Sequence, residues 1–157
     1  MADSLVRLRP GTASDLNEVA AVMGRAFEPR YGEAWTGPQC LGVLSLPGVW
    51  LTLADCGGPV AGFALARLIV DEVELLLLAT DPDWRGRGVG RALLRSVLAE
   101  AGLRDARVVH LEVRANNPAV QLYRSSGFGK VGERRNYYRG SMGQQYDAHS
   151  YAVTLGG

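Results

Sequence analysis

Hydrophobic side chains recur along the chain with two spacings, which predict helices and strands. Apolar residues appear at every third or fourth position over residues 16–27 and 89–101, the spacing of an amphipathic helix. Alternating or continuous apolar runs bounded by turn residues are typical of strands. We predict strands at residues 5–9, 49–54, 60–70, 73–80, 107–114, 131–138 and 148–155.

Capping signals place the ends of the helices. Gly102 is expected to end the helix that starts at Val89. Asn117 and Pro118 suit the start of a third helix, because Asn caps and Pro fits the first turn, and Gly127 can stop it. Residues 28–47 suggest a short helix among loops. Strands outnumber helices in a mixed order, so we expect one α/β domain over residues 1–157, with a mixed, mostly antiparallel sheet flanked by helices.

Composition excludes several classes of protein. A length of 157 residues with 47% hydrophobic residues suits one domain with a real core. No apolar run approaches the roughly 18 residues of a spanning helix, and the first residues lack the features of a signal peptide. We therefore expect a cytoplasmic protein with no membrane partner. The net charge of +1 gives no electrostatic case for direct nucleic-acid binding.

The cysteines and histidines give little sign of special chemistry. Cys40 and Cys56 could form one disulfide, but they lack CxxC spacing, and reduced thiols are the simpler interpretation. His110 and His149 lie far apart in the sequence with no cysteine cluster beside them. We expect no metal site.

A glycine- and arginine-rich segment between a predicted strand and a predicted helix has the chemistry of a phosphate-binding loop. Glycines let backbone N–H groups at the helix start approach an anion, and the helix dipole favours negative charge there. The segment fits neither GxxxxGK[ST] nor GxGxxG. Its candidate anion-binding residues are Arg85, Gly86, Arg87, Gly88, Val89, Gly90 and Arg91. A solvated glycine-rich connection is the plain alternative.

Three motifs in order carry a resemblance to a known family. Arg85-x-x-Gly88-x-Gly90 resembles the coenzyme A signature [RQ]xxGxG of the GNAT acetyltransferases. The stretch LEVRANNPAVQLY over residues 111–123 and the later RRNYY over residues 134–138 are similar to the RimI-like ribosomal-protein-alanine N-acetyltransferases. The similarity covers roughly residues 60–155, whereas residues 28–47 match poorly. The resemblance implies the GNAT fold and acetyl-CoA as co-substrate.

The resemblance also implies a role for individual residues. Glu112 matches the general base of the family and Tyr123 its general acid. The remaining coenzyme contacts fall on the strand at Leu78, Ala79 and Thr80, and on Asn116 or Asn117, because this chain is one residue shorter than the pattern there. Tyr137 and Tyr138 could line the acceptor site.

These residue types suit the attack of an amine on a thioester. A carboxylate can take the proton of the amine, and a tyrosine hydroxyl can donate to the leaving thiolate. Without the motifs, Glu112 would be a solvated residue on the polar face of a strand, and Tyr123 a core aromatic with a wet tip.

The expected acceptor is the N-terminal α-amine of a protein, with a ribosomal protein as one candidate. The enzyme itself is expected to be a monomer or a weak dimer. A small-molecule amine as acceptor, or a non-catalytic acetyl-CoA-binding module, are the alternatives.

Overall fold

A seven-stranded sheet organises residues 5–156, the part of the chain that this computed structural model describes. The strand order is β1-β2-β3-β4-β5-β7-β6, and only β4 and β5 run parallel. The predicted α/β class with a mostly antiparallel sheet is confirmed. The strands are β1 (Arg7–Gly11), β2 (Val49–Asp55), β3 (Val60–Ile69), β4 (Glu72–Thr80), β5 (Val108–Arg114), β6 (Gly129–Arg139) and β7 (Gln145–Thr154).

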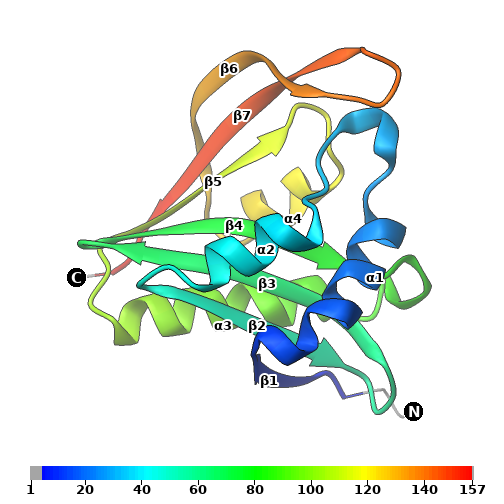
Figure 1. The fold of residues 1–157 in the computed structure, drawn as a ribbon. Helices are drawn as coiled ribbons and strands as arrows, with labels where there is room; N and C mark the ends of the chain where they lie inside the picture. Colours follow the sequence, from blue (N-terminus) through cyan, green and yellow to red (C-terminus); the bar gives the residue numbers. More distant parts are fainter. Residues whose placement is uncertain (1–4, 157) are drawn as a thin grey trace.

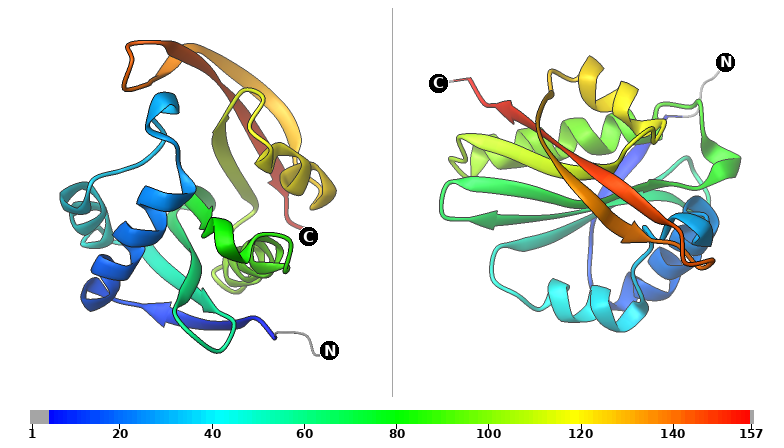
Figure 2. Two further views of the ribbon diagram at one scale, coloured as in Figure 1. Left: turned by 90° about the vertical axis from the view of Figure 1, so that its right-hand side faces the viewer. Right: turned by 90° about the horizontal axis from the view of Figure 1, so that it is seen from above.

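Helices cover both faces of this sheet (Figures 1 and 2). One face carries α1 (Leu16–Ala26) and α2 (Gly37–Leu44), and the other carries α3 (Val89–Leu103) and α4 (Ala119–Ser125). Each face buries its own apolar cluster. Met23 of α1 packs in one cluster with Leu53 and Phe63 of the sheet, and Leu93 of α3 packs in the other with Val109. Burying each such side chain contributes about 1.5–3 kcal/mol, which fixes the helices on the sheet.

Most predicted elements appear within a few residues of their expected bounds, with two corrections. The first strand runs from Arg7 to Gly11, two residues later than predicted. Gly102 does not end α3, which continues to Leu103. Asp105 instead adopts the left-handed conformation, with φ of 61°, and the N–H of Ala106 bonds back to Ala101 O at 3.0 Å. Asp tolerates this conformation better than most residues, so no glycine was needed.

Strands β4 and β5 pair at one end only and then diverge (Figure 1). Their parallel register ends at Leu75 and Leu111, although β4 continues to Thr80 and β5 to Arg114. A β-bulge at Leu76 interrupts the pairing of β4 with β3 just where the divergence begins. Bulges bend the strand that carries them. The sheet therefore opens where the later halves of β4 and β5 carry predicted site residues.

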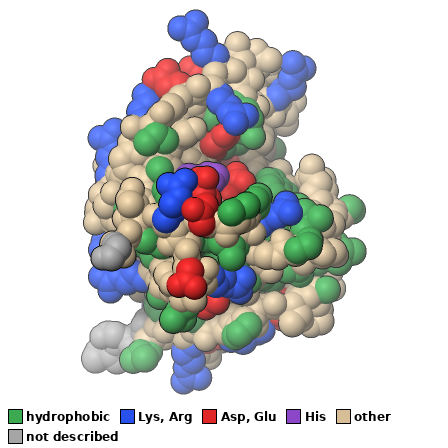
Figure 3. Space-filling model, turned by 90° about the vertical axis from the view of Figure 1, so that its left-hand side faces the viewer, with side chains coloured by type: hydrophobic (Ala, Val, Ile, Leu, Met, Phe, Trp, Pro, Cys, Tyr) green, Lys and Arg blue, Asp and Glu red, His purple; other side chains and the backbone are tan. Residues whose placement is uncertain are grey.

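The surface shows no dominant charge on the face drawn in Figure 3, where acidic and basic side chains lie interspersed. This mixture agrees with the net charge of +1. Within residues 5–156, no helix is long and apolar enough to cross a membrane. Both cysteines are free thiols, and burial raises the pKa of Cys40.

Candidate active site

The glycine-rich loop leads directly into the first turn of α3. Gly86 and Gly88 have φ of 78° and 83°, a backbone conformation that residues with a side chain adopt only under strain. Gly88 is the residue that precedes the helix, which starts at Val89. The first N–H groups of a helix have no acceptor within it, so this turn presents free donors and the positive end of the helix dipole. The local geometry is that of an anion-binding site.

The first turn of α3 lies against the end of β4 and against α4. A Cβ placed on Gly90 would lie 3.5 Å from Thr80 Oγ1 and 3.2 Å from Leu122 Cδ2. A side chain here would therefore separate the three elements. The structure thus brings the predicted coenzyme contacts on β4 next to those of the loop, beside the opening between β4 and β5.

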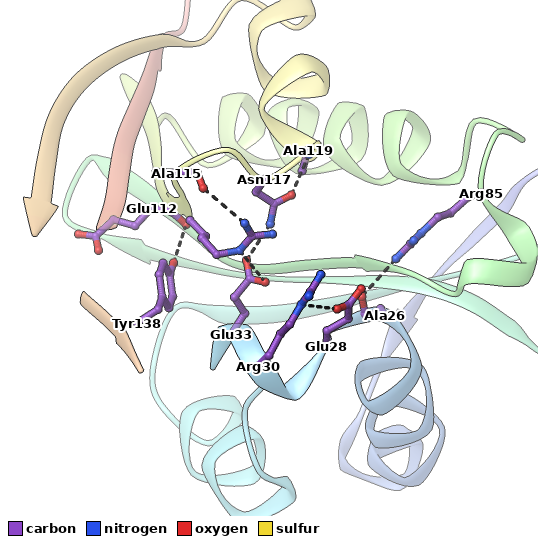
Figure 4. Close-up of polar contacts among 11 residues, drawn as sticks. Ala26, Glu28, Arg30, Glu33, Arg85, Glu112, Ala115, Asn117, Ala119 and Tyr138 are labelled. Carbon is purple, nitrogen blue, oxygen red and sulfur yellow. Dashed lines mark hydrogen bonds and ion pairs between the residues drawn. The ribbon is translucent and has the colours of Figure 1, made fainter. Parts of the chain in front are cut away.

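The side chains of the three arginines in the loop make different contacts. Arg85 Nη2 donates to Ala26 O at the end of α1, at 3.2 Å (Figure 4). The guanidinium of Arg87 stacks over the Trp84 ring at 5.0 Å. Arg91, in the first turn of α3, is exposed. Of the three, Arg91 has the side chain best placed to add charge beside the free N–H groups, whereas Arg85 is bonded to α1.

Glu112 lies on the polar face of β5, as the alternation predicted. Val113 and Leu111 are buried on the opposite face. The Glu112 side chain is 20% exposed, and its Oε1 lies 2.9 Å from Nε of Arg134 on β6. Its Oε2 is buried and has no hydrogen-bond partner among residues 5–156. One oxygen of this carboxylate is therefore paired with a cation, and the other is buried with its accepting capacity unused in the described chain.

A β-bulge in β6 presents two tyrosines to Glu112. The pairing of β6 with β7 is interrupted between Arg134 and Tyr138, and Asn136 takes a left-handed conformation with φ of 54°. The N–H of Asn136 bonds to Asp147 Oδ1 at 2.9 Å, which anchors the bulge. Bulges re-aim side chains and are common beside active sites.

The two tyrosines at the bulge, Tyr137 and Tyr138, contact each other edge to face with ring centroids 5.0 Å apart. The Tyr138 hydroxyl is directed at the carbonyl oxygen of Glu112 at 3.5 Å (Figure 4). Burial raises the pKa of the Tyr137 hydroxyl, and the negative charge of Glu112 raises it further. Tyr137 thus lies near the charge of Glu112 and Tyr138 near its backbone carbonyl, and their place in an acceptor site stays a prediction.

Tyr123 projects from α4 into the interior and is 5% exposed. Its ring meets Phe128 edge to face, with centroids 5.8 Å apart. Burial raises the pKa of its hydroxyl well above the usual range, and the negative charge of Glu33 adds to the rise. The hydroxyl therefore stays protonated at neutral pH and is able to donate a proton or a hydrogen bond.

The two asparagines that precede α4 differ in their contacts. Asn116 is exposed and has φ of 67°. Asn117 accepts from the N–H of Ala119 at 2.8 Å and donates from Nδ2 to Glu33 Oε2 at 2.7 Å. The helix starts at Ala119 and is directly preceded by Pro118, one residue later than the predicted cap at Asn117, although the Asn117 side chain still accepts from the first N–H of the helix. The neighbouring Asn116 is the more accessible to a coenzyme.

Glu33 is a site residue that the sequence did not reveal. It lies in the segment between α1 and α2, with its carboxylate facing Asn117 (Figure 4) and paired with Arg114. Arg114 Nε lies 3.3 Å from Glu33 Oε1, and both side chains are 10% exposed. The guanidinium of Arg114 also lies 3.6 Å from the centre of the Tyr31 ring. The residues are far apart in the chain, so only the folded structure joins them.

Contacts with the turn between β6 and β7 close this side of the site. Ser141 N–H bonds to Pro29 O at 3.0 Å. A Cβ on Gly32 would lie 1.9 Å from Arg139 O, and a Cβ on Gly140 would lie 1.6 Å from Arg30 O. Glycine is required at both positions for the two backbones to approach. The segment that matched the family poorly therefore borders the site beside Tyr138.

The sequence profile of the Acetyltransferase (GNAT) family matches residues 17–128. The chain belongs to this family of acetyl-transferring enzymes, and the GNAT fold expected from the motifs is confirmed. The family pattern thus covers the glycine-rich loop, Glu112 and Tyr123, but not the bulge of β6.

Individual relatives narrow the comparison to the RimI-like branch. The [ribosomal protein bS18]-alanine N-acetyltransferase of Escherichia coli is 42% identical over 89 residues, which are 56% of this chain and 60% of that protein. The N-alpha-acetyltransferase RimI of Mycobacterium tuberculosis is 45% identical over 100 residues, or 59% of this chain and 60% of that protein. The matched segments thus span about three fifths of these relatives.

A solved structure extends the likeness over nearly the whole chain. The ribosomal-protein-S18-alanine N-acetyltransferase of Escherichia coli superposes with a TM-score of 0.86 and 29% identity. The match covers 98% of this chain and 97% of that one. The predicted resemblance to RimI-like enzymes is confirmed.

Proposed function

We propose that this protein transfers the acetyl group of acetyl-CoA to the N-terminal α-amine of a protein. One observation carries the proposal. The carboxylate of Glu112, with one free oxygen, borders the opening between β4 and β5, and the anion-binding turn of α3 lies at the end of β4. A base and a site for a phosphorylated co-substrate therefore meet at one opening.

Acetyl-CoA is the co-substrate that fits this arrangement. The first turn of α3, from Gly88 to Arg91, would hold the pyrophosphate through backbone N–H groups and the side chain of Arg91. The strand from Leu78 to Thr80 lies beyond the last β4–β5 pair, so its backbone is available to the acyl chain and to the thioester carbonyl. Asn116 would contact the coenzyme from the start of α4.

Gly88→Asp tests the loop. The new carboxylate would repel the pyrophosphate, so we expect acetyl-CoA affinity to fall at least about 100-fold, since loss of a charge-assisted contact and like-charge repulsion cost several kcal/mol together. Calorimetry measures the affinity. Gly57→Asp is the matched control, because Gly57 also has a positive φ, of 94°, with open space around it. Unchanged affinity in folded Gly88→Asp would contradict the loop assignment.

The chemistry is a direct attack on the thioester. The bound amine reacts in its neutral form: its lone pair forms the new C–N bond, and the proton that must then leave the nitrogen passes to Glu112 Oε2, directly or through a water. The C–S bond of the thioester then breaks. The departing thiolate takes the hydroxyl proton of Tyr123, which burial keeps protonated. The products are an acetylated amine and free coenzyme A, and the proton on Glu112 returns to Tyr123 through solvent, which restores both groups.

An α-amine suits this base better than a lysine side chain. At pH 7 an α-amine with pKa of about 7.7–8.0 is roughly a tenth neutral, whereas a lysine at about 10.4 is far below one percent. The relatives named above act on an alanine N-terminus or on N-α positions by their names. Tyr137 and Tyr138 would flank the first residues of the peptide, and a ribosomal protein is the expected partner.

The proposal is tested by incubating the protein with acetyl-CoA and a short peptide that begins with Ala. We expect one free thiol for each acetylated peptide. A protein that binds acetyl-CoA but releases no thiol with peptides or small amines would be a non-catalytic binding module.

A further inference from the structure

Arg134 pairs with one oxygen of the predicted base and leaves the other oxygen without a partner. Its Nε lies 2.9 Å from Glu112 Oε1, while Oε2 is buried and without a partner in the described chain. The guanidinium also stacks over the Tyr137 ring at 5.3 Å. The bulge anchored by Asp147 fixes the strand just after Arg134. The cation is therefore built into the site, next to the free oxygen.

We propose that Arg134 is a positioning residue that stays on Oε1 when the acceptor amine binds at Oε2 and favours the neutral, reactive form of that amine. This inference rests on the proposed function. A carboxylate alone would stabilise the ammonium form of a bound amine and so hold the proton that must leave. A guanidinium beside the carboxylate offsets that attraction and repels a second cation. The ammonium form of the bound amine therefore loses its proton to solvent water at a lower pH than it would without Arg134.

The other charged groups around Glu112 do not supply this cation. Arg114 is engaged by Glu33 at 3.3 Å, and His149 lies 3.9 Å from Glu133. On the same face of the sheet as Glu112, the titratable and charged groups include Glu74 on β4, His110 and Arg114 on β5 and Arg134 on β6, with Tyr137 and Tyr138 beside them and Glu33 paired to Arg114. Among them, Arg134 has the guanidinium in ion-pair contact with Glu112.

The pH dependence of kcat, which reports the groups of the enzyme–substrate complex, separates this role from a purely structural one. We expect Arg134→Gln to move the acid limb to higher pH, so that the rate at pH 7 falls about three- to tenfold, as a shift of about half to one pH unit requires. The rate at the high-pH plateau should stay within about twofold of the wild type, because the amine is neutral there in both proteins. The Arg134 side chain is 60% exposed, so solvent limits the effect to this range.

The experiment compares four proteins on a peptide that begins with Ala. Arg134→Lys keeps the charge and should keep the acid limb near that of the wild type. Arg135→Gln removes the same charge from the next, exposed residue and is the matched control. Circular dichroism confirms that each variant is folded.

The possible outcomes are distinct. An acid limb that moves in Arg134→Gln but not in Arg134→Lys or Arg135→Gln supports the inference. An equal loss at every pH, superimposable profiles, or the same shift in Arg134→Lys and Arg134→Gln would overturn it while acetyl transfer stands. No transfer by the wild-type chain to any amine would overturn the proposed function and the inference together.

Discussion

Glu112→Gln is expected to lower kcat/KM about 10²–10⁴-fold at pH 7, the range typical of a lost general base. The amide keeps the shape of the carboxylate but cannot accept a proton at Oε2. The loss should be partly recovered at higher pH, where more of the amine is already neutral. A pH–rate profile from about pH 6 to 10 measures both effects.

Glu72→Gln is a matched control for this variant. Glu72 also lies in the sheet and pairs with an arginine, Arg107 at 3.6 Å, but at the opposite end of β4. It should leave the profile unchanged. A Glu112→Gln profile that runs parallel to that of the wild type at all pH values would mean that Glu112 only positions the substrate.

Tyr123→Phe is expected to lower kcat about 10²–10⁴-fold, again the range for general acid catalysis, with nearly unchanged affinity for acetyl-CoA. The hydroxyl acts on the thiolate that forms as the C–S bond breaks, so its loss affects the transition state more than the bound ground state. The ring, buried against Phe128, is kept in the variant. Steady-state kinetics and calorimetry measure the two quantities separately.

Tyr151→Phe controls for the loss of a buried hydroxyl. Tyr151 is 1% exposed, its hydroxyl accepts a long contact from Arg124 Nη2 at 3.5 Å, and the proposed reaction gives it no role. Its kcat should stay near that of the wild type. If kcat of Tyr123→Phe also stayed within about a factor of two, Tyr123 would not be the general acid.

The elements of the fold were predictable wherever side-chain spacing alone decides them. The apolar period of residues 89–101 gave α3, and the alternation from Val109 to Val113 gave the buried and polar faces of β5. Helix ends were less predictable, because the residue that takes the left-handed conformation after α3 is Asp105 and not Gly102. The divergence of β4 from β5 depends on strand pairing, which no local pattern encodes.

The candidate site also has a part that short motifs predict and a part that only the folded structure reveals. The glycine-rich loop, Glu112 and Tyr123 are carried by short motifs that sequence comparison detects. Glu33 is not, because its partner Arg114 lies far away in the chain and the segment around it lacks the family pattern. Arg134 stood within a recognised motif, but its contact with Glu112 depends on the pairing of β6 with β7 and on the bulge beside it.

The position of the acetyl group on a peptide tests the central claim most directly. Two peptides of identical sequence, each beginning with Ala and containing one internal Lys, are incubated with acetyl-CoA, one with a free and one with a blocked N-terminus. Mass spectrometry should find acetylation of the free α-amine and a nearly inert blocked peptide. Acetyl groups on lysine side chains, or only on small-molecule amines offered in parallel, would contradict the N-terminal assignment.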